Sequence, residues 1–185
     1  MELSDIDLVI LAKAARDSAA FETLVKRHQA PLRAFLVRLT GEPALADDLA
    51  QEAFLKAYRA LDGFRGGASF RSWLFSIALR EAQMARRREA ARKRAQAGAD
   101  DREESAAAPE FSLDLQRALA ALTQEERMAA LLCDAAGFSH AEAAGAMAAP
   151  VGTVKTLVAR ARDKLRAAMT GEPAAMTPCA SGGRQ

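Results

Sequence analysis

The stretch that decides the fold is 47–88, which reads DDLAQEAFLKAYRALDGFRGGASFRSWLFSIALREAQMARRR. Its first part repeats apolar residues at helical spacing, and its middle is rich in glycine. Its last part has aromatic residues at helical spacing and ends in a basic run. No alternation typical of a strand occurs in it, so the stretch predicts an all-α protein.

The predicted helix 44–61 has two unlike faces. At about 100° per residue, one arc collects the apolar core positions Leu49, Ala53, Phe54, Ala57 and Leu61. The opposite arc places Leu55 among polar residues, namely Asp47, Asp48, Gln51 and Glu52. It is either a solvated face with one scattered leucine, which the spacing alone favours, or a docking face for a basic helical partner.

The loop that follows, 62–69, reads DGFRGGAS. Phe64 and Arg65 could stack on a base and contact a phosphate, or Phe64 could fold back onto the core. No GxxxxGK[ST] pattern is present, so a nucleotide P-loop is not expected. The next helix, 70–94, ends in REAQMARRREAARKR, which either neutralises phosphates or is a solvated helix end.

The N-terminal part predicts two further helices. Ser4 and Asp7 have the spacing of a capping box, and Ser18 is the expected cap of the second helix. Pro31 lies inside that second helix and should kink or interrupt it. Gly41 should end it.

The C-terminal part predicts a second, smaller helical domain. The capping boxes TQEE (123–126) and SHAE (139–142) each open a helix, and a tight turn at 148–150 leads to a basic helix, 151–168. This order is typical of a helix-turn-helix. We therefore expect a first domain at 1–95, a flexible acidic linker at 96–111, a second domain at 112–169 and a disordered tail at 170–185.

Composition excludes several classes of protein. The net charge is only +2, and Cys133 and Cys179 imply neither a disulfide framework nor a metal motif. No apolar run reaches the ~20 residues of a membrane span, and acids replace the basic start of a signal peptide. His28 and His140 have no nucleophile or ligand at motif spacing. We expect a cytoplasmic protein that is not an enzyme and needs no cofactor.

Two segments resemble the extracytoplasmic-function (ECF) sigma factors of bacterial RNA polymerase. DDLAQEAFLKAYRAL followed by FRGGASFRSWLFSIA is similar to region 2 of that family, as is the upstream AFETLVKRHQAPLRAFLVRLTG. LTQEERMAALLCDAAGFSHAEAAGAMAAPVGTVKTLVARARDKLR resembles region 4, most clearly in PVGTVK and RAR. The resemblance covers about 5–166.

The resemblance implies a promoter-specificity subunit. Its partners would be core RNA polymerase, through the β′ coiled coil and the β flap, promoter DNA and an anti-sigma factor, with no membrane insertion. The polymerase-binding residues would be Asp47, Asp48, Gln51, Glu52 and Leu55. The −10 element would be contacted by Lys56, Phe64, Arg65, Arg71 and Arg80. The −35 element would be contacted by Thr153, Lys155, Thr156, Arg160 and Arg162.

This chain departs from the family pattern at positions that face DNA. Arg80 stands where the family usually has Asn, and Met84 where it has Asp. Leu157 and Cys133 stand where Arg is common, which weakens the expected grip on the −35 element. Two other hypotheses therefore stay open: a sigma-like decoy that binds an anti-sigma factor without starting transcription, and an autonomous helix-turn-helix regulator.

Overall fold

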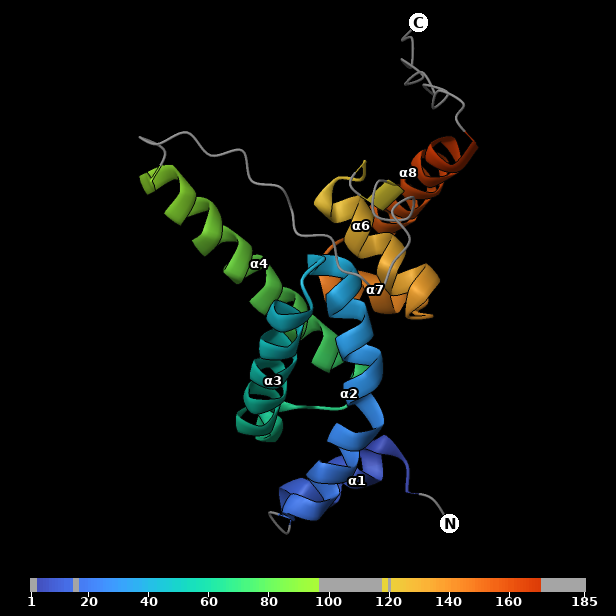
Figure 1. The fold of residues 1–185 in the computed structure, drawn as a ribbon. Coiled ribbons are helices and arrows are strands. Elements are labelled where there is room, and N and C mark those ends of the chain that lie inside the picture. The colour runs from blue at the N-terminus through green and yellow to red at the C-terminus, as the bar shows by residue number, and fades with distance from the viewer. Residues whose placement is uncertain (1–2, 15–16, 97–117, 120, 171–185) are drawn as a thin grey trace, which may run out of the picture.

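Helices form the regular structure of the described residues, and no strand occurs among them (Figure 1). The computed structural model describes residues 3–14, 17–96, 118–119 and 121–170. The first module contains α1 (Asp5–Ala14), α2 (Ser18–Thr40), α3 (Pro43–Arg59), the 3₁₀ turn η1 (Leu61–Gly63) and α4 (Phe70–Gln96). The second contains α6 (Gln124–Ala130), the π-helical turn η2 (Leu131–Ala135), α7 (His140–Met147) and α8 (Val151–Thr170). The all-α prediction is confirmed.

The helix starts follow local capping chemistry, with one correction. At α1 the Ser4 amide donates to Asp7 Oδ2 (3.0 Å) and the Asp7 amide donates to Ser4 Oγ (3.3 Å), as predicted. The prediction that Ser18 caps α2 is wrong, because Ser18 is already helical and Asp17 is the cap. The Asp17 carboxylate accepts from the amides of Ala19 (2.8 Å) and Ala20 (3.4 Å).

Of the two effects expected of Pro31, a kink or an interruption of the helix, the interruption is wrong. Helix α2 continues through Pro31 to Thr40, and the proline ring lies on its exposed side. The missing N–H costs one backbone hydrogen bond, but the buried residues Leu32 and Phe35 hold this part of the helix against its neighbours. Gly41, at φ +78°, ends α2 as predicted, and its amide donates to the Val37 carbonyl (2.9 Å).

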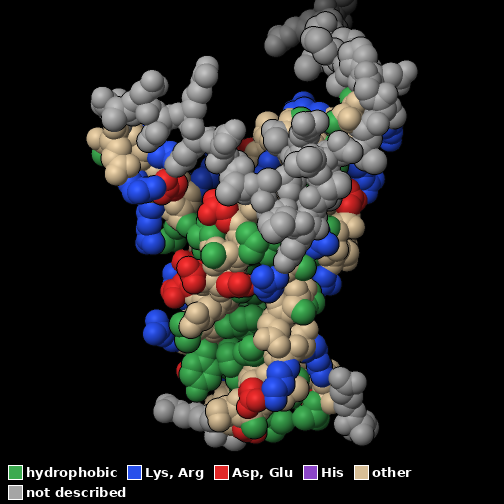
Figure 2. Space-filling model, in the orientation of Figure 1, with side chains coloured by type: hydrophobic (Ala, Val, Ile, Leu, Met, Phe, Trp, Pro, Cys, Tyr) green, Lys and Arg blue, Asp and Glu red, His purple; other side chains and the backbone are tan. Residues whose placement is uncertain are grey.

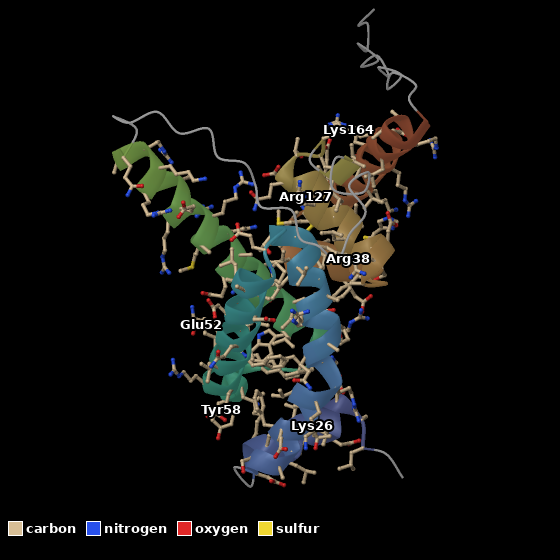
Figure 3. All side chains as sticks on the ribbon, viewed as in Figure 1. Lys26, Arg38, Glu52, Tyr58, Arg127 and Lys164 are labelled. Atoms are coloured by element: carbon tan, nitrogen blue, oxygen red, sulfur yellow. The ribbon has the colours of Figure 1, made fainter. Side chains whose placement is uncertain are left out.

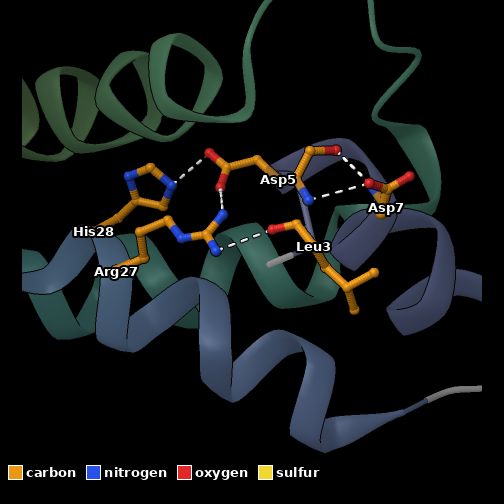
Figure 4. Close-up of polar contacts among 6 residues, drawn as sticks. Leu3, Asp5, Asp7, Arg27 and His28 are labelled. Carbon is orange, nitrogen blue, oxygen red and sulfur yellow. Dashed lines mark hydrogen bonds and ion pairs between the residues drawn. The ribbon is translucent and has the colours of Figure 1, made fainter. Parts of the chain in front are cut away.

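Polar contacts fasten α1 to α2 at one end of the first module (Figure 4). Asp5 Oδ2 lies 2.7 Å from Nε2 of buried His28, and Asp5 Oδ1 accepts from Arg27 at 2.5 Å. Arg27 also donates to the Leu3 carbonyl (3.0 Å). The His28 ring packs on Phe70 with centroids 5.5 Å apart, so this cluster lies directly beneath the start of α4.

The two modules pack against each other rather than standing apart. Helices α6, α7 and α8 gather beside α2 and the first half of α4, whose second half extends away (Figure 1). The rings of Phe75 and Phe138 lie 5.0 Å apart, and one hydrophobic cluster includes buried residues of both modules. Arg127 of α6, labelled in Figure 3, donates to the Leu39 carbonyl at the end of α2 (3.4 Å).

Two expectations about the chain's organisation stay predictions. The linker at 96–111 and the tail at 170–185 lie almost entirely outside the described residues, so the domain limits are not tested. Among the described helices, none is both long and apolar enough to cross a bilayer.

Candidate nucleic-acid interface and docking face

The acidic arc of α3 lies on the outside of the first module. Buried Ala46, Leu49 and Ala53 turn the opposite side of the helix into the core. Leu55 is 43% exposed, and the Glu52 side chain, labelled in Figure 3, points away from the body. Figure 2 shows acidic side chains beside apolar ones on this part of the molecule. We call this arc the docking face, made of Asp47, Asp48, Gln51, Glu52 and Leu55.

Neighbouring cations already balance part of the negative charge of the docking face. Arg33 of α2 donates to Asp47 (2.6 Å), and Glu52 lies 3.4 Å from the Lys56 ammonium. These pairs are largely exposed, so each contributes little to stability. Asp47 and Glu52 stay accessible at the helix surface, with about half of each side chain exposed (54% and 43%).

The loop between η1 and α4 is held at both ends. The Lys13 ammonium donates to the Phe64 carbonyl (3.1 Å), which ties the loop to α1. At the other end the Ser69 hydroxyl accepts from the Ser72 amide (3.1 Å) and so caps α4. Gly66 adopts φ +73°, a left-handed conformation that other residues rarely accept, and it turns the loop between these anchors.

Phe64 takes the folded-back position rather than an exposed one. It is 6% exposed, and its ring lies 5.0 Å from that of Trp73 and 6.2 Å from that of Phe70. Arg65 next to it is exposed. In this arrangement Arg65, not Phe64, is the loop side chain available to a nucleic acid.

A cleft of about 640 Å³ separates this loop from the second module. Its walls are the loop 63–69, one side of α4, and α7 of the second module. The wall residues from α4 are Ser72, Trp73, Ser76 and Arg80, and those from α7 are Ala141, Glu142, Gly145 and Ala146. Arg80 is exposed at this cleft, and its contact with DNA stays a prediction.

Lys56 has an acidic partner that the sequence did not reveal. Its ammonium lies 2.6 Å from Glu81 of α4, whose side chain is only 11% exposed. The hydrogen bond to Glu81 is the main cause that raises the pKa of Lys56. Glu81 therefore positions Lys56 between α3 and α4. Since the two residues lie 25 positions apart on different helices, no local spacing signals the pair.

Arg71 points to the second module rather than to solvent. Its guanidinium donates to the Ala136 carbonyl, which follows η2, and lies 4.5 Å from the centroid of the Phe138 ring. It also lies 5.7 Å from the Phe75 centroid. The structure therefore does not group Arg71 with exposed Arg65 and Arg80.

The second module has the predicted helix-turn-helix order. Both capping boxes are confirmed: Thr123 with Glu126, and Ser139 with Glu142. Ala148 adopts φ +52° in the turn before α8. Val154 and Val158 bury one face of α8, and the opposite side exposes predicted −35 residues, namely Thr153, Lys155, Thr156 and Arg160.

Arg162, the last predicted −35 residue, is engaged within the module. Its guanidinium lies 2.5 Å from Asp134 of η2, and the hydrogen bond to Asp134 raises the pKa of Arg162. Cys133, beside Asp134, is half-buried. Burial is the main cause that raises the pKa of its thiol, so an activated thiolate is not favoured there.

Known proteins share both modules. Residues 24–92 match the family model of sigma-70 region 2, and residues 112–165 match that of sigma-70 region 4. The ECF RNA polymerase sigma-E factor of Escherichia coli (strain K12) is 34% identical over 176 residues, which cover 86% of this chain and 92% of that protein.

Solved structures agree with these matches. The sigma factor RpoE of Bartonella quintana, solved in complex with the anti-sigma factor NepR, has a TM-score of 0.71 at 30% identity and covers 83% of this chain and 98% of its own. CnrH, solved with the cytosolic domain of CnrY, has a TM-score of 0.69 at 28% identity. This match covers 91% of this chain and 98% of CnrH.

Together the fold and these matches define a protein of the sigma-70 class with regions 2 and 4. Within that class, the chain belongs to the family of ECF RNA polymerase sigma factors.

Proposed function

We propose that this chain is an alternative sigma factor that binds core RNA polymerase, directs it to a dedicated set of promoters and is held in check by an anti-sigma factor. It acts as a binding subunit without catalysis of its own. The observation that carries the proposal is the presence of both modules in one chain, with the docking face, Arg65 and Arg80 at the surface of the first and most of the predicted −35 residues at the surface of the second.

The docking face supports the polymerase part of the proposal. An exposed leucine surrounded by carboxylates suits a basic, amphipathic helical partner such as the β′ coiled coil, because an apolar centre with a charged rim gives both affinity and orientation. Contact of the second module with the β flap belongs to the same proposal.

Two separate surfaces support the DNA part. Arg65 and Arg80 lie exposed on the −10 side, with Lys56 half-exposed nearby on α3. Thr153, Lys155, Thr156 and Arg160 lie on the exposed side of α8, where a recognition helix would enter the major groove. Control by an anti-sigma factor rests on family membership, since the sigma factor RpoE of Bartonella quintana was captured with the anti-sigma factor NepR.

Run-off transcription tests the proposal directly. The full chain is added to core polymerase on DNA from upstream of its own gene and of neighbouring genes. We expect a discrete product that core polymerase alone does not make. Absence of a product from every fragment, despite correct folding, would refute the proposed function.

The decoy hypothesis has one observation in its favour. Leu157 and Cys133, at positions where the family commonly has DNA-contacting arginines, are half-buried apolar or weakly polar side chains here. A decoy would bind an anti-sigma factor and yield no run-off product, so the same experiment separates the two functions.

A further inference from the structure

Helix α1 contacts the loop at 63–69 through two of its residues. The Lys13 ammonium donates to the Phe64 carbonyl (3.1 Å). The Gly66 backbone lies beside Ile6, since a Cβ placed on Gly66 would be 3.6 Å from Ile6 Cδ1, an ordinary van der Waals separation. Ile6 and Lys13 are seven positions apart, which is close to two helical turns, so one face of α1 supports the loop.

Helix α1 is itself fixed on the first module. Leu8 and Val9 are buried on its inner side. At its start, Asp5 Oδ2 lies 2.7 Å from Nε2 of buried His28 (Figure 4). The Lys13 ammonium therefore extends from a fixed support, and a hydrogen bond from a charged donor is stronger than one between neutral groups.

Phe64 is held through its amide, its carbonyl and its ring. The amide donates to the Leu61 carbonyl (3.0 Å), the carbonyl accepts from Lys13, and the ring lies 5.0 Å from that of Trp73. A carbonyl and the amide of the next residue belong to one planar peptide unit. The Lys13 contact therefore fixes the plane from which the backbone of Arg65 continues.

The rest of the loop constrains Arg65 much less. Residues 65–69 are all exposed. Arg65 is followed by Gly66, Gly67 and Ala68, which bring almost no side chain that could pack on the module. The orientation of Arg65 is therefore set mainly from its N-terminal side, where Phe64 is held.

We propose that Lys13 is a positioning residue for the −10 element: through the Phe64 carbonyl, it presents Arg65 to the unpaired promoter strand. The inference rests on the proposed function, since the orientation of Arg65 matters only in a chain that opens promoter DNA. Helix α1 precedes residues 24–92, which match region 2, so that match assigns Lys13 no role.

A double-mutant cycle in the polymerase holoenzyme tests the proposal. In the full chain, Lys13→Met keeps the side-chain length and removes the donor, and it is made alone and together with Arg65→Ala. Each protein is mixed with core polymerase on a fragment that gives run-off product, and permanganate reactivity of unpaired thymines measures promoter opening. Lys26→Met is the matched control, at an exposed lysine of α2 that pairs with Glu22.

We expect Lys13→Met to reduce promoter opening about tenfold when Arg65 is present and to have no further effect beside Arg65→Ala. Lys13→Arg keeps a donor and should retain most of the opening, and Lys26→Met should leave it unchanged. Equal reductions with and without Arg65 would overturn the proposal, because Lys13 would then act independently of Arg65. Weaker pull-down of core polymerase by Lys13→Met would also overturn it, because the effect would not be confined to the loop.

A measurement on the free chain separates this proposal from the proposed function. If the wild type gives no run-off product on any fragment, the proposed function fails, and Trp73 then reports on the loop. Trp73 is the one tryptophan of the sequence, and its ring packs on that of Phe64. We expect acrylamide to quench its fluorescence more strongly in Lys13→Met than in Lys26→Met at equal helical circular dichroism. Equal quenching would overturn the positioning role without reference to transcription.

Discussion

Glu126 is buried, 4% exposed, and yet serves two partners at once. Its Oε2 accepts from the Thr123 amide (2.8 Å) and from the Lys164 ammonium of α8 (2.6 Å). Desolvation by itself raises the pKa of Glu126, but the hydrogen bonds from Lys164 and Thr123 outweigh it and the pKa is lowered. One carboxylate thus caps α6 and fastens it to α8.

Glu126→Gln should lower the free energy of unfolding by about 1–3 kcal/mol, because it weakens the cap and leaves Lys164 without its ion pair. Glu142→Gln is the matched control: it changes the same position of the other capping box, which is exposed and has no lysine contact in the described structure. Urea unfolding of both variants measures the difference. Equal losses would show that the Lys164 contact contributes nothing.

The pH dependence of stability should follow from the same residue. Because the pKa of Glu126 is lower in the folded chain than in the unfolded one, its contribution is present above the unfolded pKa of about 4.3 and is lost as pH falls through the folded pKa. We expect Glu126→Gln to reduce the loss of stability on acidification from about pH 5 to about pH 3. Parallel curves for variant and wild type would contradict this.

At the scale of the element, α3 separates a packing face from a binding face. We expect Asp48→Lys together with Glu52→Lys to weaken binding to core polymerase by at least about tenfold, or ~1.4 kcal/mol, because two attractive charges become repulsive. Glu22→Lys with Glu125→Lys is a control of equal charge change at exposed acids elsewhere. Pull-down measures the binding of each variant to core polymerase, and equal binding by both variants would exclude the docking face.

Helix α8 carries the residues that are predicted to contact the −35 element. We expect Lys155→Ala to weaken binding to promoter duplex and to reduce the slope of log K against log salt by about one, as for the loss of one phosphate contact. Lys26→Ala, at an exposed cation on α2 (Figure 3), is the control. Fluorescence anisotropy across a salt series measures both variants. An unchanged slope for Lys155→Ala would show that α8 does not contact DNA there.

At the scale of the whole molecule, the shared hydrophobic cluster predicts cooperative unfolding. Phe138→Ala should cost about 3–5 kcal/mol and should split one thermal transition into two, since it removes packing between the modules. Val158→Ala, within the second module, should lower stability without splitting the transition. Differential scanning calorimetry distinguishes these outcomes, and two transitions in the wild type would show that the modules already unfold independently.

Most of the fold could be predicted because it depends on residues three or four positions apart. Apolar periodicity located the helices, and the pairs Thr123–Glu126 and Ser139–Glu142 marked two helix starts. The error at Ser18 is also local, because the neighbouring Asp17 is the cap. The error at Pro31 is not local, because the packing of α2 against other helices outweighs one lost hydrogen bond.

The candidate site was only partly predictable, because burial and partner choice depend on contacts distant in sequence. The amino-acid sequence by itself determined the family, the helices and the charged arcs of α3 and α8, since these arise from spacing along one helix. Only the tertiary structure decided that Phe64 is buried, that Glu81 holds Lys56 and that Arg71 contacts Ala136 and Phe138. The contacts of Lys56 and Arg71 join residues 25 to 67 positions apart, and only chain packing brings such residues together.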